Sequence, residues 1–234
     1  MIVVGTTLCA FAMSHPAVWG NWLKTAERMR EYSPEELHFF TAIETDARGL
    51  EPFQPLLARL EEVGGSYWTY TLDDGRTSVT TANRLRHITM GQNLVTDFCC
   101  APGVSHLLFM AADCMPPADT IPKLLELEHP LVGGEVTTYC LSGPPVPKYP
   151  FPVQEHMATA AFLFIARDVF KQLRWRWDPD TGMTDDPSYH HDALTLLGIP
   201  TYVRKDCVGR HYPESIGAIE HRGYDMRVVR TNDE

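Results

Sequence analysis

Strand-like and helix-like segments alternate along the first half of the chain, and this order restricts the fold more than any other feature. Short β-branched or aromatic runs predict strands at residues 2–4, 37–43 and 66–71. Between and after these strands, apolar residues at helical spacing predict helices at residues 19–32, 55–63 and 80–97. Such alternation is typical of βαβ units, so we expect an α/β fold with a mostly parallel sheet.

The second half of the chain continues with elements of both kinds. Strands are expected at residues 131–139, 157–166 and 201–203. Helices are expected at residues 119–128, 167–174 and 185–197, and a proline-rich loop at residues 142–152. Neither an internal repeat nor a clear linker interrupts this order. We therefore expect one domain at residues 1–212, followed by a C-terminal tail at residues 213–234.

Composition favours a packed, ordinary globular protein. Of the 234 residues, 44% are apolar, and the formal net charge is −10. An acidic chain is a poor candidate for coating nucleic acid, because such binding depends on Lys and Arg neutralising phosphates. The six cysteines form no CxxC pair, which argues against zinc ribbons and thioredoxin-type motifs. The sequence shows neither a signal peptide nor an apolar run of about 18 residues, so we expect a cytoplasmic protein without an integral membrane segment.

A single acidic residue, Asp113, interrupts an apolar stretch that reads HLLFMAADCMPP at residues 106–117. We expect a buried strand here that ends at Asp113, because Pro116 and Pro117 prevent further pairing. Ligands of open α/β sheets bind at the carboxyl ends of the strands. A carboxylate there can hold Mg²⁺ or Mn²⁺ together with phosphate oxygens, or it can cap the turn before the prolines.

Other residues are expected at the same edge of the sheet. Thr6 and Thr7 lie in the loop expected after the first strand, and Glu44 follows the second strand. Arg84 lies near the start of the helix that precedes the Asp113 strand. Its guanidinium offers forked donors for a phosphate or a nucleotide, or lies on a solvated helix face.

Two further segments carry side chains with useful chemistry. Asp185 and Asp186 open an expected helix. Acidic residues at a helix N-terminus are favoured by the helix dipole, but a pair of carboxylates also suits a general base that deprotonates an acceptor hydroxyl. His211 lies shortly after the last expected strand. It matters because a metal ion held by Asp113 would need another protein ligand, which an imidazole can supply.

Several nucleotide-binding and hydrolase motifs are missing from the sequence. It has no GxGxxG after the first strand, no GxxxxGK[ST] and no GxSxG. The segment after the first strand, GTTLCAFAMSHP, is neither glycine-rich nor basic. A nucleotidyltransferase is therefore the least favoured of the enzymes considered.

Four segments in order resemble the motifs of family-2-like GT-A fold glycosyltransferases. HLLFMAADCMPP resembles the strand and DxD segment of that family, although the motif reads Ala-Ala-Asp here. ATAAFLFIARDVFKQL, at residues 158–173, resembles its acceptor strand. MTDDPSYHHDALTLLGIPTYV, at residues 183–203, resembles its acidic helix, and CVGRHY, at residues 207–212, its closing strand with a metal-binding histidine. The resemblance covers residues 1–212.

This resemblance implies a single GT-A (Rossmann-like) domain with a mixed, mostly parallel central sheet flanked by helices. Residues 1–117 would form a nucleotide-sugar-binding half and residues 118–212 an acceptor-binding half. The donor would be a UDP- or GDP-linked sugar, from which a hexosyl or pentosyl group moves to an acceptor hydroxyl. Contacts to the nucleotide would come from Thr6, Thr7, Glu44 and Arg84.

The resemblance also implies roles in the reaction. Asp113 and His211 would hold Mn²⁺ or Mg²⁺ on the diphosphate, and Asp186 or its neighbour Asp185 would be the catalytic base. The acceptor stays open: a glycan, a protein or a modified base would all suit the same donor half. Because Ala111 replaces the first Asp of the DxD motif, the alternative is a non-catalytic nucleotide- or glycan-binding module on the same fold.

Overall fold

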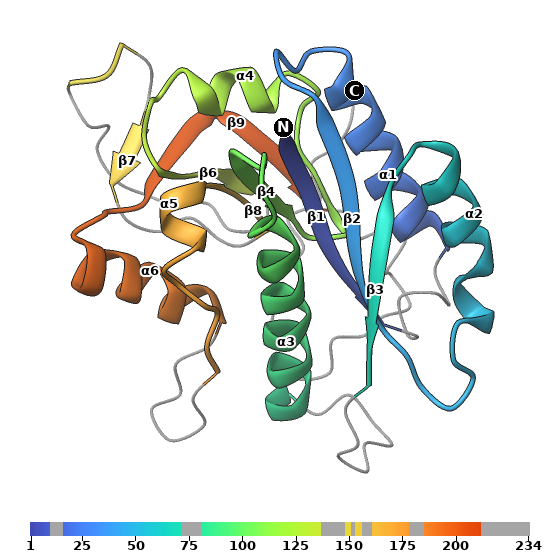
Figure 1. Cartoon of the computed structure of the whole chain (residues 1–234). Helices are drawn as coiled ribbons and strands as arrows, with labels where there is room; N and C mark the ends of the chain where they lie inside the picture. Colours follow the sequence, from blue (N-terminus) through green and yellow to red (C-terminus); the bar gives the residue numbers. More distant parts are fainter. Residues whose placement is uncertain are drawn as a thin grey trace.

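The computed structural model describes residues 1–9, 16–71, 81–136, 148–150, 153–155, 161–177 and 185–211 (Figure 1). Nine of its strands form one sheet. In spatial order, eight of them are β3 (Ser66–Tyr70), β2 (Leu37–Glu44), β1 (Ile2–Cys9), β4 (His106–Met110), β8 (Phe162–Ala166), β6 (Leu131–Val136), β9 (Tyr202–His211) and β5 (Cys114–Met115). The ninth strand, β7 (Val153–Glu155), also pairs with β9.

Most of these strands point in one direction. The neighbours β3, β2, β1 and β4 pair in parallel. Strand β8 runs antiparallel to both β4 and β6, so β6 and its parallel partner β9 point the same way as the first four strands. Only β5, β7 and β8 run in the opposite direction. The expected α/β fold with a mixed, mostly parallel sheet flanked by helices is confirmed.

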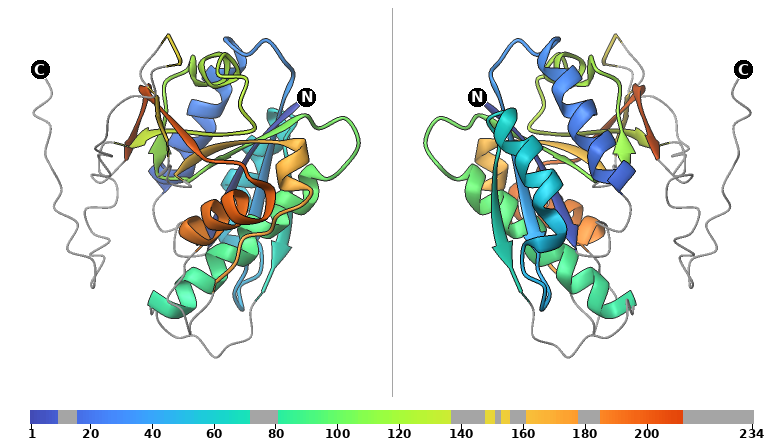
Figure 2. Two further views of the ribbon diagram at one scale, coloured as in Figure 1. Left: turned by 90° about the vertical axis from the view of Figure 1, so that its left-hand side faces the viewer. Right: turned by 90° about the vertical axis from the view of Figure 1, so that its right-hand side faces the viewer.

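Helices cover both faces of the sheet (Figure 2). One face carries α1 (Pro16–Arg30), α2 (Gln54–Glu62), which follows the short 3-10 helix η2 (Glu51–Phe53), and α4 (Thr120–Leu125). The other face carries α3 (Thr81–Cys99), α5 (Arg167–Phe170) and α6 (Asp185–Leu197). Alternation along β1 explains the two layers: Ile2 and Val4 pack on the α1 side, whereas Val3 packs on the α3 side.

The first strand is longer than expected, and the loop expected at Gly5-Thr6-Thr7 is wrong. Strand β1 continues through these residues to Cys9, paired with β2 along its whole length. Gly5 is there for packing, because a Cβ at this position would lie 2.3 Å from Cγ1 of Val95. A glycine that normally indicates a turn therefore lets α3 approach the middle of the sheet.

The last strand is also longer than expected, since β9 reaches His211 instead of ending at residue 203. The charged residues of β9 break the alternation of apolar residues that indicates a strand in a sequence. The segment is nevertheless a strand, because it pairs with β6, β7 and β5. The described part of the strand expected at 157–166 begins at Phe162, and the strand expected at 131–139 is described only to Val136. Most of the loop expected at 142–152 and the tail at 213–234 lie outside the described residues.

Strand β9 contains an irregularity that matters below. Gly134 of β6 is paired with Arg204, but the next residue, Glu135, is paired with Val208. Three residues of β9 are therefore inserted between two successive pairs, which makes a wide bulge. Among the described helices, none is long and apolar enough to cross a membrane.

Replacing Gly134 with Ala is expected to destabilise the protein by about 1–3 kcal/mol. A Cβ on Gly134 would lie 1.8 Å from Cζ of Phe162 and 2.4 Å from the carbonyl oxygen of Cys207. Gly20→Ala is the control, because no atom lies within 4 Å of a Cβ there and alanine favours the helix by about 1 kcal/mol. Urea unfolding of both variants checks this; equal stability of Gly134→Ala and wild type would contradict the packing.

Candidate active site

The connections of the first four strands define a switch point in the sheet. From β1 the chain passes through α1 to β2 and through α2 to β3, all on one side of β1. It then returns through α3, on the opposite face, to β4 on the other side of β1 (Figure 1). Ligands of open α/β sheets bind outside the carboxyl ends of the strands at such a point. The region at the carboxyl ends of β1 and β4 is therefore the candidate site.

Asp113 lies at this switch point, but in a turn and not in the strand where we expected it. Strand β4 ends at Met110, and the amide of Cys114 donates to the carbonyl oxygen of Ala111 at 3.0 Å, which closes a β-turn. Ala112 fixes this turn by packing on an apolar cluster beneath β1 and β2, formed by Leu8, Ile43, Phe53 and Leu56. The half-buried Asp113 is thus held at the carboxyl edge of β4 by the turn.

The end of β9 lies beside Asp113. The short strand β5 follows the turn directly and pairs antiparallel with β9, with Cys114 opposite His211 and Met115 opposite Arg210. Asp113 and His211 are 98 positions apart in sequence, yet the pairing brings their backbones together. The expectation that these two residues meet at one edge agrees with the backbone register.

Cys114, although adjacent, is a poor metal ligand. Burial, together with the nearby Asp113 and Cys207, raises the pKa of the Cys114 thiol well above its usual value, so the thiol stays protonated at neutral pH. Where side chains are described, no group of three or more His, Cys, Asp and Glu residues is placed to hold a metal ion. A cation at this edge would therefore depend on Asp113, on His211 and on oxygens of a substrate.

Glu44 lies at the carboxyl edge of the sheet, as expected, but its contact with His87 was not predicted. It ends β2 in register with Cys9 and Tyr70, so it lies at the carboxyl edge. There its carboxylate forms a short contact with Nδ1 of His87 on α3, and the hydroxyl of Tyr70 donates to the His87 carbonyl oxygen at 2.9 Å. The side chains of His87 and Glu44 are 4% and 12% exposed. Glu44 thus ties α3 to the sheet at the edge of the candidate site.

The spacing of residues on the inner face of α3 indicates from the sequence that His87 faces the sheet. His87, Gly91, Val95 and Cys99 are spaced by four residues and all face the sheet. A Cβ on Gly91 would lie 2.7 Å from Cγ2 of Thr7, so this helix approaches the end of β1 closely. A histidine on such a face needs a polar partner, and the acidic residue at the end of β2 supplies it.

The remaining residues expected to contact a nucleotide differ in their positions. Thr6 is fully buried inside β1, so its side chain is not accessible in this structure, and its contact with a nucleotide stays a prediction. Thr6 is buried because the strand continues past it. Thr7 is half-buried beside Gly91, on the α3 side. Arg84 lies in the first turn of α3, at the carboxyl edge, and its side chain is outside the described residues.

Asp185 and Asp186 are at the N-terminal end of α6, as expected. Helix α6 leads through residues 198–201 into the start of β9 (Figure 1). The side chain of Asp186 is partly buried. Farther along the helix, Nδ1 of His190 forms a hydrogen bond of 2.8 Å with the Thr201 hydroxyl.

An ion pair between a half-exposed arginine and a buried aspartate joins α6 to the segment 171–177, which in turn packs on α3. Nε and Nη2 of Arg176 each donate to the carboxylate of Asp192 at 2.7 Å, and Asp192 is only 8% exposed. The preceding residue, Trp175, stacks on Tyr189 of α6 with 4.2 Å between ring centroids. The backbone of Trp175 also exchanges two hydrogen bonds of 2.9 Å with the side-chain amide of Asn93 on α3. The two helices that carry Arg84 and Asp186 are thereby held together.

Arg176→Met is expected to lower the free energy of unfolding by about 1 kcal/mol, because the buried Asp192 carboxylate loses the partner that binds both of its oxygens. Arg59→Met is the matched control. Arg59 is about as exposed as Arg176, but its partners Glu27 and Glu62 are more exposed than Asp192, and such surface pairs contribute about 0–1 kcal/mol. Denaturant unfolding of the two variants gives the comparison, and equal losses would contradict the role of the Arg176–Asp192 pair.

The fold and this edge define a class: an α/β protein with a mostly parallel sheet and a candidate ligand site at the β1/β4 switch point.

Comparison with solved structures finds the galactosyltransferase LgtC, solved with donor and acceptor sugar analogues, at 14% identity and a TM-score of 0.46. The match covers 90% of this chain and 73% of LgtC. It also finds the glycosyltransferase GlyE of Streptococcus pneumoniae TIGR4, at 15% identity and a TM-score of 0.39. That match covers 83% of this chain and 39% of GlyE. No family model and no curated protein matches the sequence. We therefore base the function on the residues at the carboxyl edge.

Proposed function

We propose that the chain is a glycosyltransferase that moves a sugar from a UDP- or GDP-linked donor to an acceptor hydroxyl. One observation carries this proposal: the β4–β5 turn places Asp113 at the switch point of the sheet, and β9 brings the backbone of His211 beside it. The switch point is where α/β proteins bind nucleotides. A carboxylate and an imidazole at that point suit a substrate that carries a diphosphate and a divalent cation.

The donor set fits Mn²⁺ or Mg²⁺. These ions are commonly held by one or two protein ligands together with substrate phosphate oxygens, and the neighbouring Cys114 thiol stays protonated. Asp113 and His211 would hold the ion. When bound, the ion offsets the negative charge of the departing nucleoside diphosphate.

Other residues of the chain would accept the acceptor's proton and bind the nucleotide. Asp186, or its neighbour Asp185, accepts the proton of the acceptor hydroxyl as the sugar is transferred, which makes it the general base. Thr7 and Arg84 would contact the nucleotide, and an arginine is suited to phosphate oxygens. Glu44 acts mainly through His87, because its carboxylate already binds that side chain. The acceptor is a glycan, a protein or a modified base.

A second function is favoured by one residue. Ala111 stands where the resembling family has the first Asp of its DxD motif, so one carboxylate of the nucleotide site is missing. A chain that binds a nucleotide or a glycan on this fold without transferring a sugar would tolerate that loss. Such a module would keep Asp113 and bind a donor, but it would release no nucleoside diphosphate from it.

A hydrolysis and transfer screen separates the two functions. The full chain is incubated with a panel of UDP- and GDP-sugars, with Mn²⁺, and with acceptors of the three classes, and the release of nucleoside diphosphate is measured. A transferase releases UDP or GDP from at least one donor, and the release increases with a suitable acceptor. Donor binding, measured by calorimetry, without any release favours the non-catalytic module, and absence of both donor binding and release would exclude the transferase and a nucleotide-binding module.

A further inference from the structure

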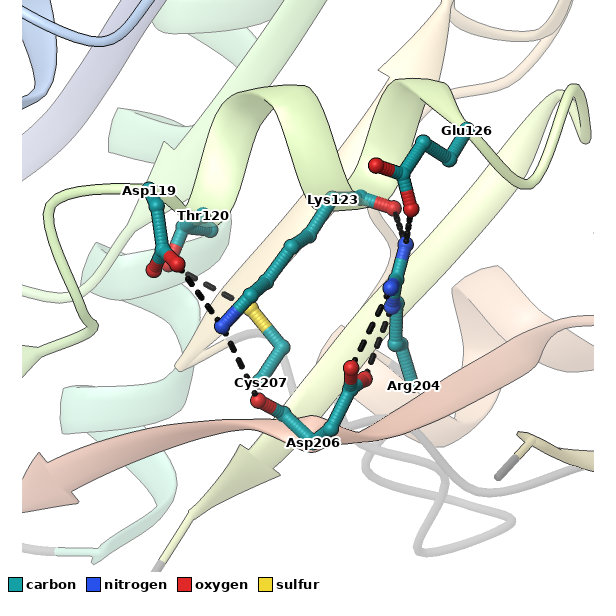
Figure 3. Close-up of polar contacts among 7 residues, drawn as sticks. All are labelled: Asp119, Thr120, Lys123, Glu126, Arg204, Asp206 and Cys207. Atoms are coloured by element: carbon teal, nitrogen blue, oxygen red, sulfur yellow. Dashed lines mark hydrogen bonds and ion pairs between the residues drawn. The ribbon is translucent and has the colours of Figure 1, made fainter. Parts of the chain in front are cut away.

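A cluster of charged side chains fixes the bulge of β9 to helix α4 (Figure 3). Arg204 is at its centre, and its side chain is only 4% exposed. Nε and Nη2 of Arg204 donate to the two carboxylate oxygens of Asp206 at 2.7 and 3.1 Å. Nη1 donates to Glu126 at 2.8 Å and also to the carbonyl oxygen of Lys123. One guanidinium thus binds the bulge and the end of α4 at once.

The rest of the bulge is held by the same helix. Nζ of Lys123 pairs with Asp119 at 2.9 Å and donates to the carbonyl oxygen of Asp206 at 3.4 Å. The thiol of Cys207 donates to the hydroxyl of Thr120 at 3.3 Å. Figure 3 shows these contacts reaching from α4 to the bulge. We call the group Arg204, Asp206 and Glu126 the clamp.

Two members of the clamp, Arg204 and Asp206, carry their charges at neutral pH. Hydrogen bonds from Arg204 hold the pKa of Asp206 below its usual value, so the carboxylate remains ionised. A buried guanidinium is expensive to desolvate unless good partners surround it. A strand that continued straight along β6 would need no such arrangement. The clamp therefore stabilises the bulge. The bulge in turn determines how the last part of β9 pairs with its neighbours.

The bulge sets the register of the last part of β9. A straight strand would pair residue 205 with Glu135, whereas the structure pairs Val208 there, so the register shifts by three residues. Without the shift, Val208 and not His211 would stand opposite Cys114. A shift by an odd number of residues also exchanges the two faces of a strand.

The packing around Gly209 agrees with this register. A Cβ on Gly209 would lie 2.6 Å from Cε1 of Phe162 and 2.7 Å from Sγ of Cys114, so the position accepts only glycine. With no bulge, Asp206 would occupy it, and a carboxylate would be forced against an apolar ring. Gly209 and the clamp thus independently favour the same register of β9 on β6.

We propose that the clamp positions the candidate active site: by fixing the bulge, Arg204, Asp206 and Glu126 place His211 opposite Cys114 and beside Asp113. None of the three touches the substrate, so they are positioning residues. The ligand role of His211 rests on the proposed function. The effect of the clamp on the backbone does not.

Hydrogen exchange measured by mass spectrometry tests the backbone effect in the full chain. Asp206→Asn keeps the size of the side chain and removes the ionic bonds to Arg204. In this variant we expect amides of residues 208–211 and 114–115 to exchange at least 10-fold faster, while amides of β2 keep their rate. Arg59→Met, which removes an exposed pair on α2, is the control. Equal exchange at 208–211 in both variants, or a uniform rise across the whole sheet, would overturn the proposal.

Mn²⁺ affinity, measured by calorimetry on the same proteins in the presence of UDP or GDP, separates the clamp from the proposed function. We expect Asp206→Asn to weaken Mn²⁺ binding about 10-fold, as supporting residues of metal sites commonly do. If wild type binds Mn²⁺ and Asp113→Asn does not, but Asp206→Asn binds as wild type does, the clamp proposal fails and the proposed function stands. If wild type binds no Mn²⁺ while the local exchange still rises, the proposed metal role fails and the clamp stands. Glu126→Gln, at an exposed end of the clamp, replaces Asp206→Asn in both measurements should the latter not fold.

Discussion

Asp113→Ala is expected to lower the turnover of a nucleotide-sugar donor by about 100-fold or more. The carboxylate lies on a turn at the switch point, after the end of β4. Its removal takes away the proposed acidic ligand for a cation on the diphosphate, so the charge of the leaving group would be less well stabilised. Asp113→Asn keeps the shape and is expected to lose nearly as much.

Asp97→Asn is the control for this experiment. Asp97 lies on the exposed surface of α3, where it pairs with Arg174 at 2.9 Å, at the helix end far from the carboxyl edge. Initial rates of nucleoside diphosphate release, measured at several Mn²⁺ concentrations, give the comparison. If Asp113→Ala retained the wild-type rate and metal dependence, Asp113 would be no more than a turn residue.

Asp186→Asn is expected to reduce kcat by about 100-fold to 10,000-fold without weakening donor binding, because a general base acts on the acceptor and not on the nucleotide. Asp185→Asn made in parallel identifies which of the two carboxylates takes the proton. Loss of one negative charge at a helix N-terminus costs about 0.3–1 kcal/mol, so both variants should fold. A loss of that size cannot account for a hundredfold change in rate.

Two measurements together separate catalysis from structure for these residues. Donor affinity is measured by calorimetry, and transfer is measured at saturating donor. A base gives unchanged affinity with low kcat in one of the two variants. Equal, small effects of both variants on kcat would leave the acidic pair with the helix-capping role alone, and the base would have to be another residue.

The order of strands and helices was predictable because it depends on local patterns. β-Branched runs and helical spacing gave the first three strands and helices, and the βαβ rule gave their parallel pairing. Gly5 misled the prediction, since its role is to admit Val95 of α3, a contact between residues 90 positions apart. Local patterns ended the last strand at residue 203, because the charged residues of β9 are satisfied by one another and by α4, which no local pattern reveals; a strand at residues 207–212 came only from the family resemblance.

The candidate site was predictable only in part for the same reason. The proximity of Asp113 to the end of β9 came from the order of motifs, and the register of β5 on β9 agrees with it. The burial of Thr6 could not be predicted once the strand was ended too early. The partnership of Glu44 with His87 depends on how closely α3 approaches the sheet, which Gly91 allows. Long-range packing, and not residue type, decides these cases.

The most direct test of the central claim is a calorimetric titration of the full chain with UDP and with GDP, each with and without Mn²⁺, repeated on Asp113→Asn. If the β1/β4 switch point is a nucleotide site with Asp113 as a cation ligand, one of the two nucleotides binds, Mn²⁺ strengthens its binding, and Asp113→Asn loses that strengthening. Failure of wild type to bind either nucleotide under both conditions, or equal binding by wild type and Asp113→Asn in the presence of Mn²⁺, would contradict the claim.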